Sequence, residues 1–204
     1  MDNRLPIYFA ELNEETQGID CISFVEKPAM EVNLMKFSKQ DKQKYYSVLD
    51  NVHHRVIAPI CRCNFPIYRK DSDLGEYYII YDRQTIEKIA KKMFEDGKLN
   101  RYNIEHQSSN KLDGVYYLEI FIKDTDKGIN PTGFEDIENG SLFGVFNIEN
   151  PQIWEKVERG DNIGISFEGY FDLSLKEEDD NIEDADIEEY LTIIQKQINY
   201  LKQK

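Results

Sequence analysis

Short segments with a strand pattern recur along the chain, and they constrain its fold more than any other feature. Two of the strongest are "GEYYIIYD" (75–82) and "GVYYLEIFIKD" (114–124), which are rich in aromatic and β-branched residues. Weaker runs of the same kind occupy residues 5–12, 18–29, 54–71, 100–107, 141–149 and 163–175. Runs of this composition, bounded by glycine, proline or aspartate, are typical of β-strands. The sequence therefore predicts a fold built mainly from strands.

Two segments instead have the pattern of short helices. Residues 82–97 stop at a glycine and carry an apolar face, for which the predicted residues are Ile86, Ile89, Ala90, Met93 and Phe94. Residues 150–160 begin with Asn150 as the cap and Pro151 in the first helical position, and they end at Gly160. Because these helices do not alternate regularly with the strands, the predicted fold class is α+β, with a β-rich, barrel-like core flanked by short helices.

The segments between these elements are expected to be irregular. Residues 31–50 are polar and mixed, which favours a surface helix or a loop. Pro59 and Pro66 are expected to interrupt the strand runs of residues 54–71. The segment 125–140 is rich in glycine, asparagine and aspartate, which is typical of a long loop, and long loops in compact domains are often functional.

The composition changes at residue 177, which divides the chain into a domain at 1–176 and a tail at 177–204. Residues 177–189 contain nine acidic side chains among thirteen, so this stretch is expected to be a solvated linker. From Ile187 onward, apolar residues recur at helical spacing: Ile187, Tyr190, Leu191, Ile194, Ile198 and Leu201. Such a helix can fold back on the domain or bind a partner or a second copy of the chain. The acidic linker favours the second interpretation.

Charge and cysteine content narrow the class of protein. The formal net charge is −14, so phosphate repulsion argues against a nucleic-acid partner. No stretch reaches the roughly 18–20 apolar residues of a membrane span, and the N-terminus does not resemble a signal peptide. Three cysteines, Cys21, Cys61 and Cys63, indicate reduced thiols in a cytoplasm. The "CRC" spacing at 61–63 is too tight for a usual zinc pair, and no cofactor is expected.

A serine hydrolase requires a nucleophile, a base and an orienting acid, and histidine is the limiting residue in this chain. Of the three histidines, His53 and His54 are interpreted as exposed loop residues. His106 follows Glu105 at the end of a strand and precedes the predicted loop "QSSNKLDG" (107–114), so it is placed to act in a groove. A hydrogen-bonded surface histidine is the alternative.

The serine of "GISFEGYF" (164–171) is the candidate nucleophile. Gly164 and Gly169 flank Ser166, which would let another backbone approach closely, as a peptide substrate must. In a strand, Ser166 shares a face with Glu168, while Ile165 and Phe167 face the core. An ordinary strand serine and a solvent-facing acid are the alternative interpretations of these two residues.

Six stretches, in this order and spacing, resemble one family. They are "GIDCISFVEKPAMEVNLMKFS" (18–38), "HRVIAPICRCNFPIYR" (54–69), "GEYYIIYDRQTIEKIAKKMF" (75–94), "NIEHQ" (103–107), "GSLFGVFNIENPQIWEKVERG" (140–160) and "GISFEGYF" (164–171). Together they resemble the phage prohead (capsid-maturation) serine proteases, especially those of Bacteroidetes and crAss-like phages. That family is similar in fold to herpesvirus assemblin, with a barrel-like core flanked by helices.

The resemblance implies roles for particular residues. The family places its catalytic histidine at the end of the "NIEH" strand, which is His106, and its nucleophile in the "G-x-S-x-E/G-G" strand, which is Ser166. In the commoner members an acid precedes an "S-x-V-x-x-P-A" motif that follows the nucleophile. Here "SFVEKPA" (23–29) stands near the N-terminus, which implies a circular permutation.

The third catalytic residue should then lie in the strand predicted at residues 18–29. The motif position falls on Cys21, and the acid available is Asp20, one residue earlier. A shift of one residue reverses the face of a strand side chain unless a β-bulge intervenes. Asp20 is therefore taken as the acid, with Glu168 and Glu105 as alternatives, and a dyad without a fixed acid also stays open.

The resemblance implies hydrolysis of peptide bonds during head assembly, in the host cytoplasm and inside the immature prohead. The expected substrates are the scaffold protein and the major capsid protein, with autocleavage in the acidic segment and docking on the portal as further expectations. Self-association into a homo-oligomer is also expected of the tail. The alternatives are a catalytically inactive capsid-assembly protein that keeps the protease fold and an unrelated β-rich hydrolase of small esters.

Overall fold

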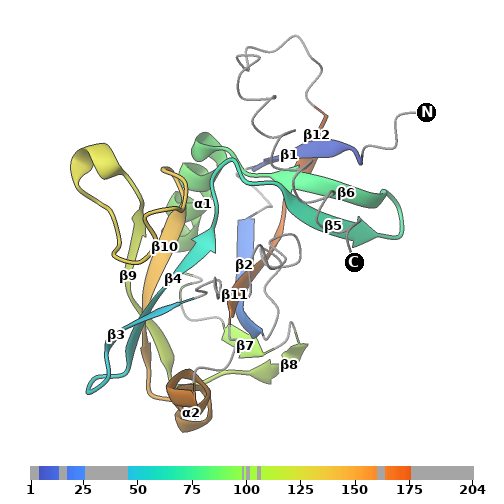
Figure 1. Cartoon of the computed structure of the whole chain (residues 1–204). Coiled ribbons are helices and arrows are strands. Elements are labelled where there is room, and N and C mark those ends of the chain that lie inside the picture. The colour runs from blue at the N-terminus through green and yellow to red at the C-terminus, as the bar shows by residue number, and fades with distance from the viewer. Residues whose placement is uncertain are drawn as a thin grey trace, which may run out of the picture.

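The computed structural model describes residues 5–13, 18–25, 46–97, 99, 102–104, 107–159 and 164–175 (Figure 1). The strands are β1 (Ile7–Glu11), β2 (Gly18–Val25), β3 (Ser47–Asp50), β4 (Arg55–Cys61), β5 (Ile67–Asp71), β6 (Gly75–Ile80), β7 (Tyr102–Ile104), β8 (Gln107–Lys111), β9 (Val115–Ile122), β10 (Leu142–Ile148), β11 (Gly164–Tyr170) and β12 (Asp172–Ser174). The helices are α1 (Arg83–Glu95), the short 3-10 helix η1 (Thr125–Lys127) and α2 (Pro151–Arg159). The predicted α+β class is confirmed, with strands predominating.

The described strands form three four-stranded sheets. Their orders are β12–β1–β6–β5, β3–β4–β10–β9 and β11–β2–β7–β8. Strands β2 and β11 lie at the centre of the molecule, and the chain passes from β11 directly into β12 of the first sheet (Figure 1). Among the described residues no strand pairing joins one sheet to the next, so the barrel-like arrangement is not confirmed.

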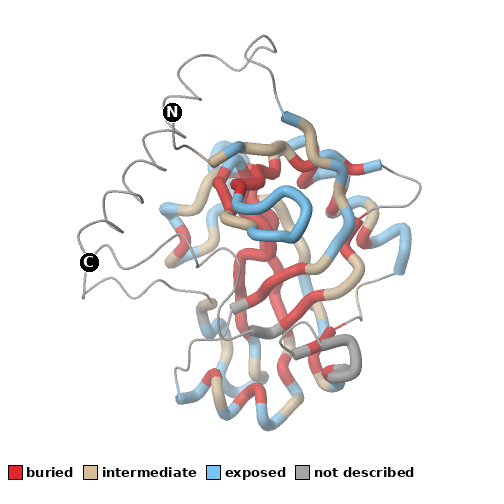
Figure 2. Tube along the Cα trace, turned by 90° about the vertical axis from the view of Figure 1, so that its right-hand side faces the viewer, coloured by how far each residue is buried: buried red, intermediate tan, exposed pale blue. Residues whose placement is uncertain are grey.

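One large apolar cluster holds the sheets and helices together. It contains buried side chains from each sheet and from both α-helices, including Ala10, Ile22, Ile60, Ile86 and Ile153. Figure 2 shows these buried segments running through the middle of the fold. Burial of apolar surface is the main favourable contribution to folding, so this shared core fixes the relative positions of the three sheets. Neither of the α-helices in the described part of the chain is long and apolar enough to cross a membrane.

Helix α1 lies within its predicted range of 82–97, but one residue of its predicted apolar face is exposed. The Asp82 side chain accepts a hydrogen bond from the backbone N–H of Thr85, as an N-cap residue does. Ile86, Ile89 and Met93 of the predicted apolar face are buried, but Phe94, which was assigned to the same face, is 58 % exposed. Phe94 lies one residue, or about 100°, around the helix from Met93 and reaches the rim of a groove instead.

Helix α2 confirms the expectation for its start. The Asn150 side chain accepts hydrogen bonds from the backbone N–H groups of Gln152 and Ile153, and Pro151 is the first helical residue. The buried face of the helix consists of Ile153, Trp154 and Val157. The predicted stop at Gly160 lies outside the described residues.

Strand pairing overrides several local expectations. Residues 47–50, expected in a helix or loop, form β3 because they pair with β4, and residues 107–111, expected in a loop, form β8 by pairing with β7. Pro59 lies within β4 instead of interrupting it, since β3 pairs with β4 only as far as Ile57 and the ladder to β10 shifts register near Pro59. The single strand expected at 163–175 is divided into β11 and β12.

The segment 125–140 is a loop, as predicted, apart from η1 and a short bridge between Asp124 and Ile129. Lys123, which lies just before the loop and is 1 % exposed, holds it by hydrogen bonds. The Lys123 ammonium donates hydrogen bonds to the carbonyl oxygens of Phe134, Glu135 and Ile137, at 2.8, 3.0 and 2.5 Å. A buried ammonium is tolerated only when its protons are bound in this way, so Lys123 fixes the path of the loop.

Candidate active site

Three neighbouring strands bring a row of polar residues together on one face of the central sheet. Ser166 of β11 pairs with Ser23 of β2, and Ser23 pairs with Asn103 of β7. Residues that pair across adjacent strands point to the same face, so the three side chains lie side by side. They are 6 %, 0 % and 4 % exposed. A buried polar row of this kind is unusual on a sheet whose opposite face contributes Ile165 and Phe167 to the core, as predicted.

Glu168 joins this row through hydrogen bonds. The Ser23 Oγ lies 2.6 Å from Asn103 Oδ1 and 2.8 Å from Glu168 Oε1, so its single proton has two acceptors in range. The Asn103 Nδ2 donates to the same Glu168 oxygen at 3.1 Å. Glu168 is therefore half-buried and bonded within the sheet, and its interpretation as a solvent-facing acid is wrong.

Ser166 itself is not activated by any described residue. Within the described ranges its hydroxyl makes no hydrogen bond, although Ser23 lies directly opposite. A nucleophilic serine needs a base within hydrogen-bond reach. The predicted base, His106, and the alternative acid Glu105 lie outside the described residues.

The other two histidines are engaged elsewhere, at the turn between β3 and β4. The His53 Nδ1 lies 2.7 Å from the Asp50 carboxylate, and this hydrogen bond lowers the pKa of Asp50. His54 stacks on Trp154 with ring centroids 4.2 Å apart, and its Nδ1 lies 3.2 Å from the Ile148 carbonyl oxygen. His53 is exposed, as expected, whereas His54 is half-buried by this stacking. Both lie in a turn that joins two strands of a different sheet from that of Ser166.

Asp20 occupies an irregularity in the pairing of β2 with β11. Glu168 pairs with Cys21, but the next residue, Gly169, pairs with Ile19, so Asp20 is the extra residue of a bulge. Ile19 and Ile22, three residues apart, both belong to the main apolar core, as a change of facing between them permits. The bulge that the Asp20 assignment required is thus present at this position.

A groove of about 380 Å³ runs beside this bulge. Asp20 and Glu168 both line it, together with aromatic side chains and Arg69. Ser166 is not among the residues that line it. The structure therefore brings Asp20 and Glu168 to one groove, and it brings Glu168 into the polar row of Ser166.

Gly169 has a different role from the one expected of it. A Cβ at this position would lie 2.5 Å from the Gly18 carbonyl oxygen. The close approach that Gly169 permits is made by the neighbouring strand of this chain, at the bulge. Its expected role, to admit the backbone of a substrate, is not what the described contacts show.

Two residues of the cluster, Ser23 and Asn103, were not predicted from the sequence. Both are polar residues within the motifs "SFVEKPA" and "NIEHQ", and a polar residue at an inward strand position was the available signal. The partners of Ser23 lie 80 and 145 residues away in the sequence, and those of Asn103 lie 80 and 65 residues away, which local patterns cannot show.

The cysteines contribute no described metal centre. Cys61 and Cys63 are buried free thiols, and burial raises the pKa of Cys63 to about 12. The segment 61–63 is expected to be strand throughout; Cys61 is the last residue of β4, but Cys63 lies in the turn that follows, so the expectation is wrong for Cys63. Among the described residues no group of three histidine, cysteine or acidic side chains is arranged to hold a metal ion.

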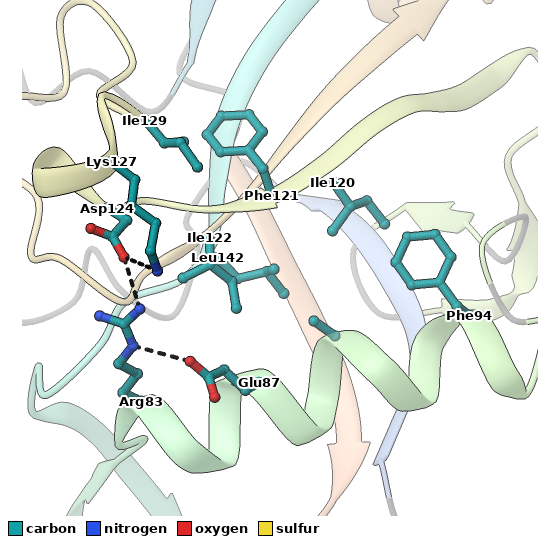
Figure 3. A pocket seen from close by; sticks show the side chains of 11 residues that line it. Arg83, Glu87, Phe94, Ile120, Phe121, Ile122, Asp124, Lys127, Ile129 and Leu142 are labelled. Atoms are coloured by element: carbon teal, nitrogen blue, oxygen red, sulfur yellow. Dashed lines mark hydrogen bonds and ion pairs between the residues drawn. The ribbon is translucent and has the colours of Figure 1, made fainter.

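A second groove, of about 400 Å³, lies between α1 and β9 (Figure 3). Its apolar part includes Phe94 and Ile120, and its other end carries an ion-pair network. There the Asp124 carboxylate lies 3.0 Å from Arg83 and 2.9 Å from Lys127. These hydrogen bonds, that of Lys127 first, lower the pKa of Asp124 to about 2. None of the residues lining this groove belongs to β2, β7 or β11.

Comparison of the chain with protein-family models, with curated proteins and with solved structures finds no match. The site must therefore be interpreted from its motifs and its geometry.

Proposed function

We propose that this protein is a serine endopeptidase of the prohead-maturation type, with a barrel-like core related to that of assemblin. One observation carries the proposal. The motifs "SFVEKPA", "NIEHQ" and "GISFEGYF" are far apart in the sequence, yet they enter the neighbouring strands β2, β7 and β11. Polar residues of the three motifs, Ser23, Asn103 and Glu168, hydrogen-bond to one another. Convergence of this kind is expected when separate motifs build one site.

In the proposed reaction Ser166 attacks the carbonyl carbon of a peptide bond. His106, three residues after Asn103 in the sequence, takes the hydroxyl proton and then gives it to the leaving amine. Water, activated by the same histidine, hydrolyses the acyl-enzyme and releases Ser166. Asp20 is proposed to orient the imidazole, with Glu168 and Glu105 as the alternatives. The engagement of His53 and His54 in another sheet supports His106 as the base.

The proposed substrates are the scaffold protein and the major capsid protein of the immature prohead, in the host cytoplasm. The acidic segment 177–189 is proposed as a site of autocleavage. The tail beyond it is proposed to bind the portal, the scaffold or a second copy of the chain. Cleavage of a scaffold empties the head before DNA is packaged, which gives the reaction its place in assembly.

Co-expression with the scaffold and capsid proteins tests the proposal. Scaffold cleavage should occur with the wild-type chain and fall by at least 10³-fold in Ser166→Ala and His106→Ala, the order of loss seen when one member of a catalytic triad is removed. His53→Ala is the matched control, because it removes an exposed histidine from a different sheet, and it should cleave normally. Normal scaffold processing by Ser166→Ala or His106→Ala would contradict the assignment.

A second function is favoured by one observation: Ser166 is only 6 % exposed. A capsid-assembly protein that keeps the protease fold without catalysis has no need for an accessible serine. In that case heads would assemble with the wild-type chain and with Ser166→Ala alike, and no scaffold fragment would form with either. Assembly with wild-type cleavage, lost in Ser166→Ala, excludes this second function.

A further inference from the structure

The carboxylate of Glu168 reaches across a whole strand. Glu168 belongs to β11 and Asn103 to β7, and these strands are not neighbours, because β2 lies between them. The Glu168 Oε1 nevertheless accepts a hydrogen bond from Asn103 Nδ2 at 3.1 Å. Ser23, on the intervening strand, is within hydrogen-bond distance of both. The three side chains therefore tie three strands together on the face that carries Ser166.

The bonds of this cluster fix the orientation of each member. The Asn103 amide directs its nitrogen to Glu168 and its oxygen to Ser23, so a rotation of the amide by 180° would break both bonds. Ser23 is fully buried, and its proton lies between two acceptors. Buried polar networks of this kind hold one geometry, because each lost bond leaves a buried polar atom unpaired.

We infer that Ser23, Asn103 and Glu168 form a positioning unit that holds β11, the strand of Ser166, at a fixed spacing from β7, the strand that leads to His106. This inference rests on the proposed function. The three are positioning residues, since they act through the placement of the nucleophile and the base. Glu168 acts here as an acceptor of hydrogen bonds from Ser23 and Asn103, and this role does not require its negative charge.

This role separates Glu168 from an orienting acid of a triad. Glutamine keeps an oxygen at the position of Glu168 Oε1, and that oxygen can accept both hydrogen bonds. Alanine removes the acceptor altogether. A positioning role therefore tolerates Glu168→Gln and does not tolerate Glu168→Ala, whereas an orienting acid needs its charge and tolerates neither.

The test measures the rate at which a fluorescent fluorophosphonate labels Ser166 in the full-length chain. The variants are Ser23→Ala, Asn103→Leu, Glu168→Ala and Glu168→Gln. Ser141→Ala is the matched control, because Ser141 is also fully buried and its hydroxyl also makes a hydrogen bond, in a different part of the fold. Thermal melting of every variant is recorded alongside, so that labelling is compared only between folded chains.

We expect labelling to fall at least ten-fold in Ser23→Ala, Asn103→Leu and Glu168→Ala, and to stay within about three-fold of wild type in Glu168→Gln and Ser141→Ala. The double variant Ser23→Ala/Glu168→Ala should be labelled no more slowly than the slower single variant, because the residues act as one unit.

If the wild-type chain is labelled and the three variants react at its rate, the positioning unit is wrong and the proposed function stands. If the labelling rate falls as far in Glu168→Gln as in Glu168→Ala, Glu168 acts through its charge and the inference is also wrong. An unlabelled wild-type chain would overturn the proposed function and the positioning role with it.

Discussion

Ser166 of β11 lies directly opposite Ser23 of β2, and both residues are buried in the central sheet. The two serines are not equivalent, because the Ser23 hydroxyl is hydrogen-bonded to Asn103 and Glu168, whereas the Ser166 hydroxyl makes no hydrogen bond within the described part of the chain. A structural serine and a candidate nucleophile thus stand side by side. The hydroxyl of Ser23 is engaged in the cluster, and Ser166 stays the proposed nucleophile.

The buried ammonium of Lys123 should be important for stability. In Lys123→Met the carbonyl oxygens of Phe134, Glu135 and Ile137 lose their shared donor, so the free energy of unfolding should fall by about 3 kcal/mol. Urea unfolding followed by tryptophan fluorescence measures this change. Lys91→Met, which removes an exposed lysine of α1, is the control and should change little. Equal midpoints for the two variants would show that the Lys123 bonds do not hold the loop.

The Asp124 ion pairs should make stability depend on pH in an acidic window. Hydrogen bonds from Lys127 and Arg83 lower the pKa of Asp124 from 3.8 to about 2 in the folded chain. A lowered folded-state pKa means that the contribution is complete above the unfolded value and is lost as the pH falls through the folded value. Wild type should therefore be more stable than Asp124→Asn at pH 6, and the difference should shrink between about pH 4 and pH 2. Unfolding curves at several pH values measure it, and a difference that stays constant down to pH 2 would contradict it.

Gly169 should not tolerate a side chain. The Cβ of Gly169→Ala would lie 2.5 Å from the Gly18 carbonyl oxygen, so the backbone must shift at a cost of about 1–3 kcal/mol. Because Gly169 follows Glu168, the same shift should also slow the labelling of Ser166. Thermal melting and labelling measure the two effects, with the exposed Tyr170→Ala as the control. An alanine variant with wild-type melting would mean that this close contact can relax freely.

Alanine substitution of Met93 and of Phe94, adjacent residues near the end of α1, should lower the free energy of unfolding by very different amounts. Met93→Ala creates a cavity in the core and should cost about 2–5 kcal/mol, whereas Phe94→Ala removes an exposed ring and should cost less than about 1 kcal/mol. Chemical denaturation of both variants checks this. Similar losses would indicate that Phe94 is packed in solution, as the helical pattern alone had suggested.

The sequence by itself determined the local elements of this protein. The range of α1, the start of α2, the strong strands β6, β9 and β10, and the loop at 125–140 follow from residue types and their spacing, because these signals act over a few residues. The motifs likewise pointed to Ser166 and Glu168 before any contact was known. Phe94 marks the limit of such reasoning, since helical spacing predicts a face but not how far the neighbouring sheet extends over it.

Only the tertiary structure decided which strands are neighbours. Strand pairing joins backbone groups that are the same in every residue, so the order β11–β2–β7 and the pairing that makes β3 and β8 strands have no local signature. The same holds for the bulge at Asp20, which exists only in relation to Glu168 and Gly169. Ser23 and Asn103 became site residues for this reason: their partners are distant in sequence, and the burial of one shared core brings the three strands together.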